Sequence, residues 1–247
     1  MTSTHDSLAR STPLAGAAAP LEIDADIVLL DIEGTISPIS FVRDVLFAYS
    51  RERLSAFIAD HRGDAVVEGV LAQASALAGG ADPLAALADW QDRDVKAPPL
   101  KTLQGLIWES GYRSGAFQSP IFADALAALK RWHAAGLPLA IYSSGSVQAQ
   151  LLFFEFSAAG DLRPLFFSHF DTDIGPKIEA ASYARITEKI GARPGRIVFF
   201  SDIPKELEAA RAAGFQTVHV AKDSTPRDAS FPEISDFSEV DLVRRTL

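Results

Sequence analysis

The sequence predicts an α/β protein whose parallel sheet core is interrupted by an all-helical block. A four-residue apolar run at 27–30 is typical of a strand buried on both faces, because it leaves no side for water. From residue 137 onward, short apolar runs alternate with helical patterns, which indicates parallel strands joined by helical crossovers. Between residues 41 and 111 the apolar spacing is helical, so we expect an insertion after the first strand.

The first predicted strand ends in two acids. Asp31 follows the apolar run directly, and Glu33 precedes the turn-forming Gly34. Ligands bind at the carboxyl ends of strands in open α/β sheets. Side chains two residues apart on an extended chain share a face, and two carboxylates roughly 5 Å apart at an effective dielectric near 20 repel by about 3 kcal/mol. A cation or a proton would relieve this repulsion, although a solvated aspartate turn would also explain the pair.

Capping residues divide the inserted block into helices. Asp64 can cap one helix, and the pair Asp82-Pro83 can open the next, because aspartate accepts from free backbone N–H groups and proline fits the first turn. Apolar residues recur at helical spacing between these signals. The predicted helices cover residues 41–58, 66–77, 84–90 and 98–111.

The rest of the sheet is predicted from the second half of the chain. Ser119-Pro120 has the form of an N-cap with a first-turn proline, so we expect a helix to begin there. The chain after Lys222 shows no recognisable motif. The predicted strands are residues 139–142, 165–170, 196–200 and 217–221, and the helices between them are residues 147–156, 178–190 and 204–213.

This order of elements divides the chain into three parts. Residues 1–23 contain a weak, proline-bounded alanine stretch without a strong apolar segment, so they predict a mobile tail rather than a signal peptide. Residues 24–38 and 116–247 are expected to form the sheet core. Residues 39–115 are expected to form the helical insertion.

Polar groups follow three further predicted strands at their carboxyl ends. They are Ser143 and Ser144 after one strand, Lys177 beyond the next, and Asp202 after a third. Taken singly, a helix cap or a surface lysine would explain each of them. In chain order with Asp31, however, the set is hard to obtain by accident, because the carboxyl ends of parallel strands meet at one edge.

Each of these residue types has a task in phosphoryl transfer. A carboxylate can attack phosphorus, and a second acid can protonate the leaving oxygen and then activate water. A further carboxylate, Asp202, can complete an oxygen shell for Mg²⁺. Serine hydroxyl and backbone N–H groups at 143–145 suit phosphate oxygens, and Lys177 adds a positive charge beside them.

Composition excludes several other classes of function. The net charge of −9 opposes non-specific nucleic-acid binding. With 0 cysteines there is no thiolate nucleophile and no disulfide framework, and a reducing, cytoplasmic setting fits. No apolar run is long enough to span a bilayer. The 5 histidines are scattered and do not form a ligand pattern.

The motifs together resemble the haloacid dehalogenase superfamily of phosphotransferases. Asp31-Ile32-Glu33-Gly34-Thr35 is similar to its first motif, and Ser143, Lys177 and Asp202 are similar to the second, third and fourth. The first motif usually has aspartate where this chain has Glu33. Glu33 at this position and the segments 103–108 and 142–146 resemble the corresponding residues of the enolase-phosphatase family (acireductone synthases) of methionine salvage. The resemblance runs from about residue 26 to residue 221.

The resemblance implies a Rossmann-like core of the haloacid dehalogenase fold with an inserted helical cap. It implies a phosphorylated diketone substrate, 2,3-diketo-5-methylthiopentyl-1-phosphate, which is enolised and then dephosphorylated to the acireductone. Asp31 would be the nucleophile and a Mg²⁺ ligand, Glu33 an acid/base group associated with the metal, and Asp202 the remaining ligand. Ser143, Ser144 and Lys177 would hold the phosphate, with Lys177 also catalytic. We expect a monomer without nucleic-acid or membrane partners.

Two alternatives share this scaffold. Another Mg²⁺-dependent phosphomonoesterase, acting on a sugar or nucleotide phosphate, would have the same core motifs. A non-catalytic binding module would keep the fold but tolerate loss of an acid, whereas all the core positions are present here. The base for enolisation also stays open among Glu33, Asp94 and Lys96.

Overall fold

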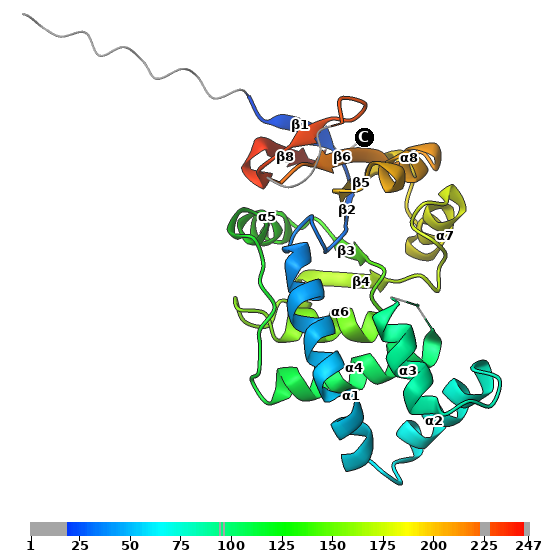
Figure 1. Cartoon of the computed structure of the whole chain (residues 1–247). Coiled ribbons are helices and arrows are strands. Elements are labelled where there is room, and N and C mark those ends of the chain that lie inside the picture. The colour runs from blue at the N-terminus through cyan, green and yellow to red at the C-terminus, as the bar shows by residue number, and fades with distance from the viewer. Residues whose placement is uncertain (1–18, 94, 96, 223–227, 245–247) are drawn as a thin grey trace, which may run out of the picture.

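A computed structural model describes residues 19–93, 95, 97–222 and 228–244, and its core is a six-stranded parallel sheet (Figure 1). The strand order is β4-β3-β2-β5-β6-β7. The strands are β2 (Ile27–Leu30), β3 (Leu139–Tyr142), β4 (Phe166–Phe170), β5 (Ile197–Ser201), β6 (Gln216–Val220) and β7 (Glu233–Ile234). Chain order runs outward in both directions from β2, so the carboxyl end of β2 lies at a topological switch point, where such sheets bind ligands.

Strand β2 is apolar throughout because both faces of the sheet are covered. Val28 and Leu30 belong to one buried apolar cluster, whereas Ile27 and Leu29 belong to another. The first cluster includes residues of α5 (Ala123–Ala134) and α6 (Val147–Glu155), and the second includes residues of α7 (Ala180–Ile190) and α8 (Pro204–Ala212). This arrangement confirms the predicted α/β core.

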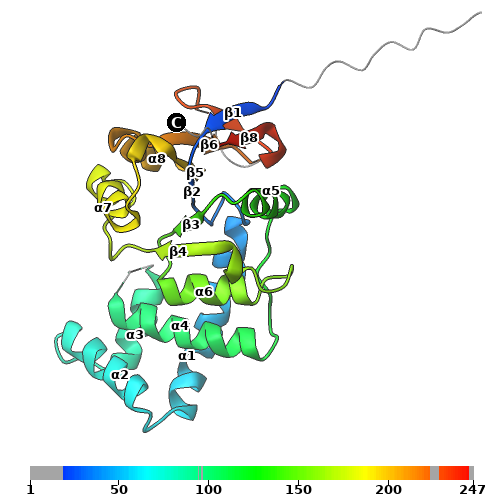
Figure 2. The ribbon, with the colours of Figure 1, turned by 180° about the vertical axis from the view of Figure 1, so that it is seen from behind.

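The inserted block has an apolar core of its own. Leu54, Val70 and Leu103 come from three of its helices and are buried in one cluster. Within the described part of residues 39–115, every regular element is a helix. Both ribbon views place α2 and the end of α1 at the part of the molecule farthest from β6 (Figures 1 and 2). The block consists of the π-helical segment η1 (Phe41–Phe47), α1 (Ala48–Asp60), α2 (Ala65–Leu77), α3 (Pro83–Asp92) and α4 (Pro98–Arg113).

Two predicted helix caps are confirmed by the structure. The carboxylate of Asp64 accepts from the backbone N–H of Val66 at 2.8 Å, and that of Asp82 accepts from the N–H of Ala85 at 2.9 Å. These aspartates satisfy N–H groups that have no partner inside the helix. They fix where α2 and α3 begin.

The helix expected at Ser119-Pro120 begins later, so that prediction is wrong. Helix α5 starts at Ala123, with Phe122 at the N-cap position. The hydroxyls of Ser119 and Tyr112 share a hydrogen bond at 2.6 Å, and the N–H of Ser119 donates to the carbonyl of Phe156. Ser119 therefore joins two segments that are distant in sequence, and it does not cap a helix.

The terminal segments also differ from the prediction. Residues 21–24 form the strand β1 (Leu21–Asp24), which pairs in parallel with β8 (Val240–Val243). The tail predicted over residues 1–23 therefore extends too far, and residues 1–18 lie outside the described residues. The pattern after Lys222 did not indicate β7, the 3₁₀ turn η4 (Phe237–Glu239) or β8, because such short strands carry little periodic signal.

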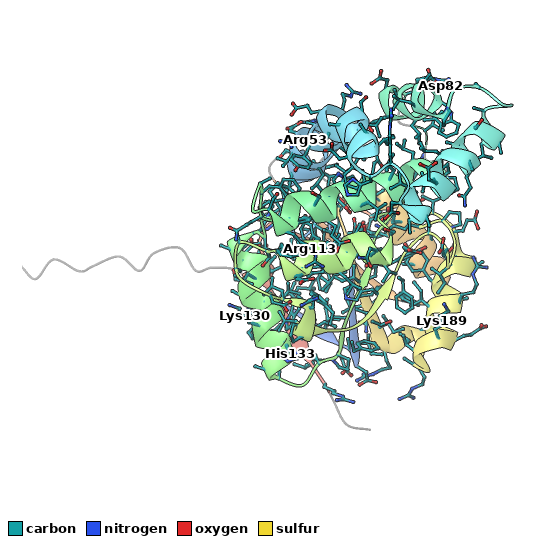
Figure 3. All side chains as sticks on the ribbon, turned by 90° about the horizontal axis from the view of Figure 1, so that it is seen from below. Arg53, Asp82, Arg113, Lys130, His133 and Lys189 are labelled. Carbon is teal, nitrogen blue, oxygen red and sulfur yellow. The ribbon has the colours of Figure 1, made fainter. Side chains whose placement is uncertain are left out.

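The surface carries the ordinary charged side chains. Figure 3 labels six residues with titratable side chains, and all six are exposed: Arg53, Asp82, Arg113, Lys130, His133 and Lys189. None of the described helices has both the length and the apolar character needed to cross a membrane.

Candidate active site

All six site residues predicted from the sequence line one cavity of about 960 Å³ between the sheet and the inserted helices. Asp31 follows β2, Ser143 and Ser144 follow β3, and Asp202 follows β5. Lys177 lies in the loop after β4, and Glu33 lies in the turn after Asp31. The sheet topology thus brings together residues that are distant in sequence.

A buried ion-pair chain occupies the floor of this cavity. The ammonium of Lys177 lies 2.6 Å from Asp31 Oδ1 and 2.7 Å from Glu206 Oε2. Burial alone would lower the pKa of Lys177, but the two carboxylates outweigh it and raise that pKa above its ordinary value. The lysine is therefore a fixed positive charge whose position orients the Asp31 carboxylate.

Glu206 is a site residue that the sequence interpretation missed. It lies in the first turn of α8, and its carboxylate accepts from the hydroxyl of Ser201 at 2.9 Å. Its place four residues after Asp202, in a helix opened by Pro204, is a signal that could have identified it. Burial, with repulsion from Asp31, raises the pKa of Glu206 to about 7.

Glu33 lies beside Ser143 in the cavity. Its carboxylate accepts from the Ser143 hydroxyl at 3.0 Å. Burial and the neighbouring Asp31 carboxylate raise the pKa of Glu33. Glu33 therefore keeps its proton to a higher pH than an exposed glutamate does. A carboxyl group with a raised pKa can donate a proton near neutral pH and accept it again afterwards.

Asp202 is held against the turn that follows β2. Its backbone N–H donates to Thr35 Oγ1 at 3.1 Å, and the same hydroxyl donates to Asp202 Oδ1 at 3.5 Å. Burial, with repulsion from Asp31, raises the pKa of Asp202 to about 7. The close approach also requires Gly34, which has φ of +80°, because a Cβ there would lie 2.1 Å from Asp202 Oδ2.

Replacing Gly34 with alanine should therefore damage both stability and activity. We expect the free energy of unfolding to fall by about 3 kcal/mol or more, since positive φ and steric overlap add. Gly63→Ala is the matched control, because Gly63 has φ of +84° and open space around it, so only the conformational cost of about 1–2 kcal/mol applies. Urea unfolding of both variants would measure the difference. Equal losses would show that contact with Asp202 is unimportant.

The loop after β3 offers polar groups for an anion. Ser143 Oγ accepts from the N–H of Gly145 at 3.1 Å, and Ser144 lines the cavity. The N–H of Val147, at the start of α6, already donates to Asp171 Oδ2 at 3.0 Å. A phosphate in the cavity would thus meet the 143–145 loop rather than the first N–H of the helix.

The donor set fits a hard divalent cation. Among the residues that line the cavity are the carboxylates of Asp31, Glu33, Asp202 and Glu206, which lie at the sheet with the ammonium of Lys177. Burial, together with repulsion from Asp31, raises the pKa of the last three acids. Within the described part of the chain, no three acidic, histidine or cysteine side chains form a metal-binding group. A site with two carboxylate ligands and one backbone carbonyl suits Mg²⁺, because this ion keeps several water molecules in its coordination shell.

The raised pKa of Asp202 predicts how the stability of the metal-free protein depends on pH. An ordinary aspartate loses its proton near 3.8, whereas folded Asp202 loses it at about 7. Between these values the folded state binds more protons than the unfolded state, so the free energy of unfolding falls as pH rises. In EDTA, the difference in melting temperature between the wild type and Asp202→Asn should therefore change to the disadvantage of the wild type as pH rises from about 4 to about 7. A difference that does not change with pH would contradict this.

The comparisons with known proteins agree with this geometry. A model of the haloacid dehalogenase-like hydrolases matches residues 25–214. The chain belongs to the haloacid dehalogenase-like hydrolase family.

More specific relatives are proteins named enolase-phosphatase E1. The protein of that name from Bradyrhizobium sp. is 65% identical over 222 residues, which cover 90% of this chain and 96% of the relative. The one from Thioalkalivibrio sulfidiphilus is 48% identical over 219 residues, covering 87% and 98%. The crystal structure of the UTR4 protein from Saccharomyces cerevisiae has a TM-score of 0.75 at 33% identity, covering 88% of this chain and 100% of that one. Both resemblances inferred from the motifs are confirmed.

Proposed function

We propose that this chain is a bifunctional enolase-phosphatase of methionine salvage. It converts 2,3-diketo-5-methylthiopentyl-1-phosphate into the acireductone 1,2-dihydroxy-3-keto-5-methylthiopentene and phosphate. The observation that carries this conclusion is the 65% identity to an enolase-phosphatase E1 over 90% of the chain. A cavity that combines acidic, cationic and apolar walls suits a substrate with a phosphate at one end and a methylthio group at the other.

Asp31 is the nucleophile in this proposal. The ammonium of Lys177, 2.6 Å away, fixes the carboxylate and offsets the charge of the incoming phosphate. Ser143, Ser144 and the loop N–H groups bind the remaining phosphate oxygens. The transferred phosphoryl group passes to Asp31 and then to water.

Glu33 serves both halves of the reaction. The product's enol lies between C1 and C2, so the proton that is lost comes from C1, the carbon bonded to the bridging phosphate oxygen. A carboxylate that reaches the bridging oxygen therefore also lies close to C1, which is bonded directly to that oxygen. Glu33, held by Ser143 at 3.0 Å, takes the C1 proton as a carboxylate, and the C2 oxygen takes up a proton from water to form the enol. Glu33 then donates its proton to the leaving oxygen as the phosphoryl group moves to Asp31. The other open candidates, Asp94 and Lys96, lie outside the described residues.

Mg²⁺ would be held by Asp31, Asp202 and Glu33, the last through its backbone carbonyl. When bound, it would offset the negative charge of phosphate and carboxylates and polarise the substrate carbonyl. Residues 39–115 would act as a cap that excludes water from the cavity. The enzyme would work as a monomer in the cytoplasm on this small molecule, without nucleic acid or membrane.

A time course on the diketone phosphate tests the function. Enol absorbance should appear before free phosphate, both products should require Mg²⁺, and EDTA should stop them. Sugar and nucleotide phosphates serve as comparison substrates. Faster release of phosphate from one of those than from the diketone, or no enol signal, would favour the alternative phosphomonoesterase.

A further inference from the structure

The short segment that ends at Lys177, residues 174–177, is held by side chains at every one of its carbonyls. It lies in a loop, residues 171–179, that belongs to no helix or strand, so no ladder of backbone hydrogen bonds fixes its position. Its four consecutive carbonyls each accept a hydrogen bond from a different side chain. The bonds run from Arg185 to Ile174 O at 2.5 Å, from Tyr142 to Gly175 O at 2.8 Å, from Ser182 to Pro176 O at 2.8 Å and from Tyr183 to Lys177 O at 2.7 Å.

The donors of these bonds lie on regular elements of the core. Ser182, Tyr183 and Arg185 lie on α7, whereas Tyr142 is the last residue of β3. The two tyrosines are 0% exposed, and their rings pack edge to face at 5.4 Å between centroids. Burial raises the pKa of Tyr183 above its ordinary value, so its hydroxyl keeps its proton and remains a donor. Packed side chains of this kind hold a neighbouring group precisely.

The segment also lies directly against α7. Gly175 has φ of +135°, and a Cβ there would lie 2.3 Å from Ser182 Oγ and 2.2 Å from Arg185 Nη2. Only glycine therefore permits this approach of the segment to the helix that holds it.

The position of the Lys177 ammonium matters because two acids share it. Its Nζ lies 2.6 Å from Asp31 Oδ1 and 2.7 Å from Glu206 Oε2, so both contacts are direct charge-assisted hydrogen bonds. A displacement of about 1 Å in an active site can cost about 100-fold in rate. A group that holds the backbone of Lys177 thus acts on the reaction through Lys177.

We propose that Tyr183 is a positioning residue for Lys177, its hydroxyl holding the Lys177 carbonyl so that the ammonium stays between Asp31 and Glu206. Tyr142 has the same task at Gly175. The inference rests on the phosphatase half of the proposed function, in which Lys177 acts on the phosphate. Of the described residues, those that line the cavity include neither tyrosine, so both act without touching the substrate.

Replacing Tyr183 with phenylalanine removes the hydroxyl and keeps the packed ring. We expect kcat for phosphate release from the diketone phosphate to fall by about 10-fold, and Tyr142→Phe should lower it as well. Tyr112→Phe is the matched control, because the Tyr112 hydroxyl is also buried and bonds to the Ser119 hydroxyl at 2.6 Å, away from every site residue. The control should lose similar stability in urea unfolding but keep kcat within about 2-fold.

A second measurement distinguishes positioning from general damage to the fold. Once Lys177→Met has removed the ammonium, nothing remains to be positioned, so adding Tyr183→Phe should lower kcat by less than about 2-fold more. An equal loss with and without Lys177→Met would overturn the role of Tyr183. Unchanged kcat in Tyr183→Phe, or an equal loss of kcat in Tyr112→Phe, would also overturn it.

The same variants assayed on 4-nitrophenyl phosphate separate this inference from the proposed function. If the wild type formed no enol from the diketone phosphate, the proposed function would be wrong. A loss of turnover on 4-nitrophenyl phosphate in Tyr183→Phe, absent from Tyr112→Phe and abolished by Lys177→Met, would still support the positioning role.

Discussion

Replacing Asp31 with asparagine should abolish phosphate release while leaving the fold intact. Asparagine keeps the shape of the side chain but cannot attack phosphorus as a carboxylate does, so we expect a loss of about 10⁴-fold or more in kcat. The variant loses the ion pair with Lys177 but also relieves repulsion of Glu33, Asp202 and Glu206. The two effects oppose each other, so stability should change by no more than about 2 kcal/mol.

Phosphate assays and urea unfolding would measure both effects. Asp173→Asn is a suitable control, because Asp173 is an exposed carboxylate in the loop that leads to Lys177. It should retain wild-type turnover. Wild-type turnover in Asp31→Asn would remove Asp31 from the role of nucleophile.

Replacing Lys177 with methionine should cost both activity and stability. The change leaves Asp31 and Glu206 buried without their shared cation. Removing one partner of a buried ion pair typically costs about 3–5 kcal/mol, and loss of a charge that orients the nucleophile should lower kcat by about 10³-fold. The stability loss should be larger at pH 8 than at pH 5, because protonation of the carboxylates at low pH relieves the unpaired charge.

The double variant Lys177→Met with Glu206→Gln separates the two effects. Removing the Glu206 charge should restore much of the lost stability, measured by urea unfolding in EDTA, but none of the activity. If Lys177→Met retained wild-type stability at pH 8, the ion-pair chain would not hold Asp31 in place.

The sequence predicted the centre of the fold well because its signals there are local. The apolar run of β2 ends abruptly at Asp31, and both faces of that strand are covered as the pattern indicates. The caps at Asp64 and Asp82 depend only on residues within one turn. All six site residues reach the same cavity, because parallel strands deliver their carboxyl ends to one edge.

The features that the sequence did not predict depend on contacts between distant segments. Strand β1 forms by pairing with β8 at the other end of the chain, and Ser119 is engaged by Tyr112 and Phe156 rather than capping a helix. Glu206 looks like an ordinary helix residue until folding buries it beside the cavity. The roles of the site residues and the boundaries of the cap stay predictions for experiment.

The most direct test of the account is to trap the phosphoryl group during a single turnover. The protein with Mg²⁺ is mixed with the diketone phosphate, quenched in acid and digested, and the peptides are weighed by mass spectrometry. The account predicts one added phosphoryl group on the peptide that contains Asp31, removable by hydroxylamine and missing from Asp31→Asn. A phosphoryl group on another residue, or full phosphate release with no phosphorylated peptide at any time point, would contradict it.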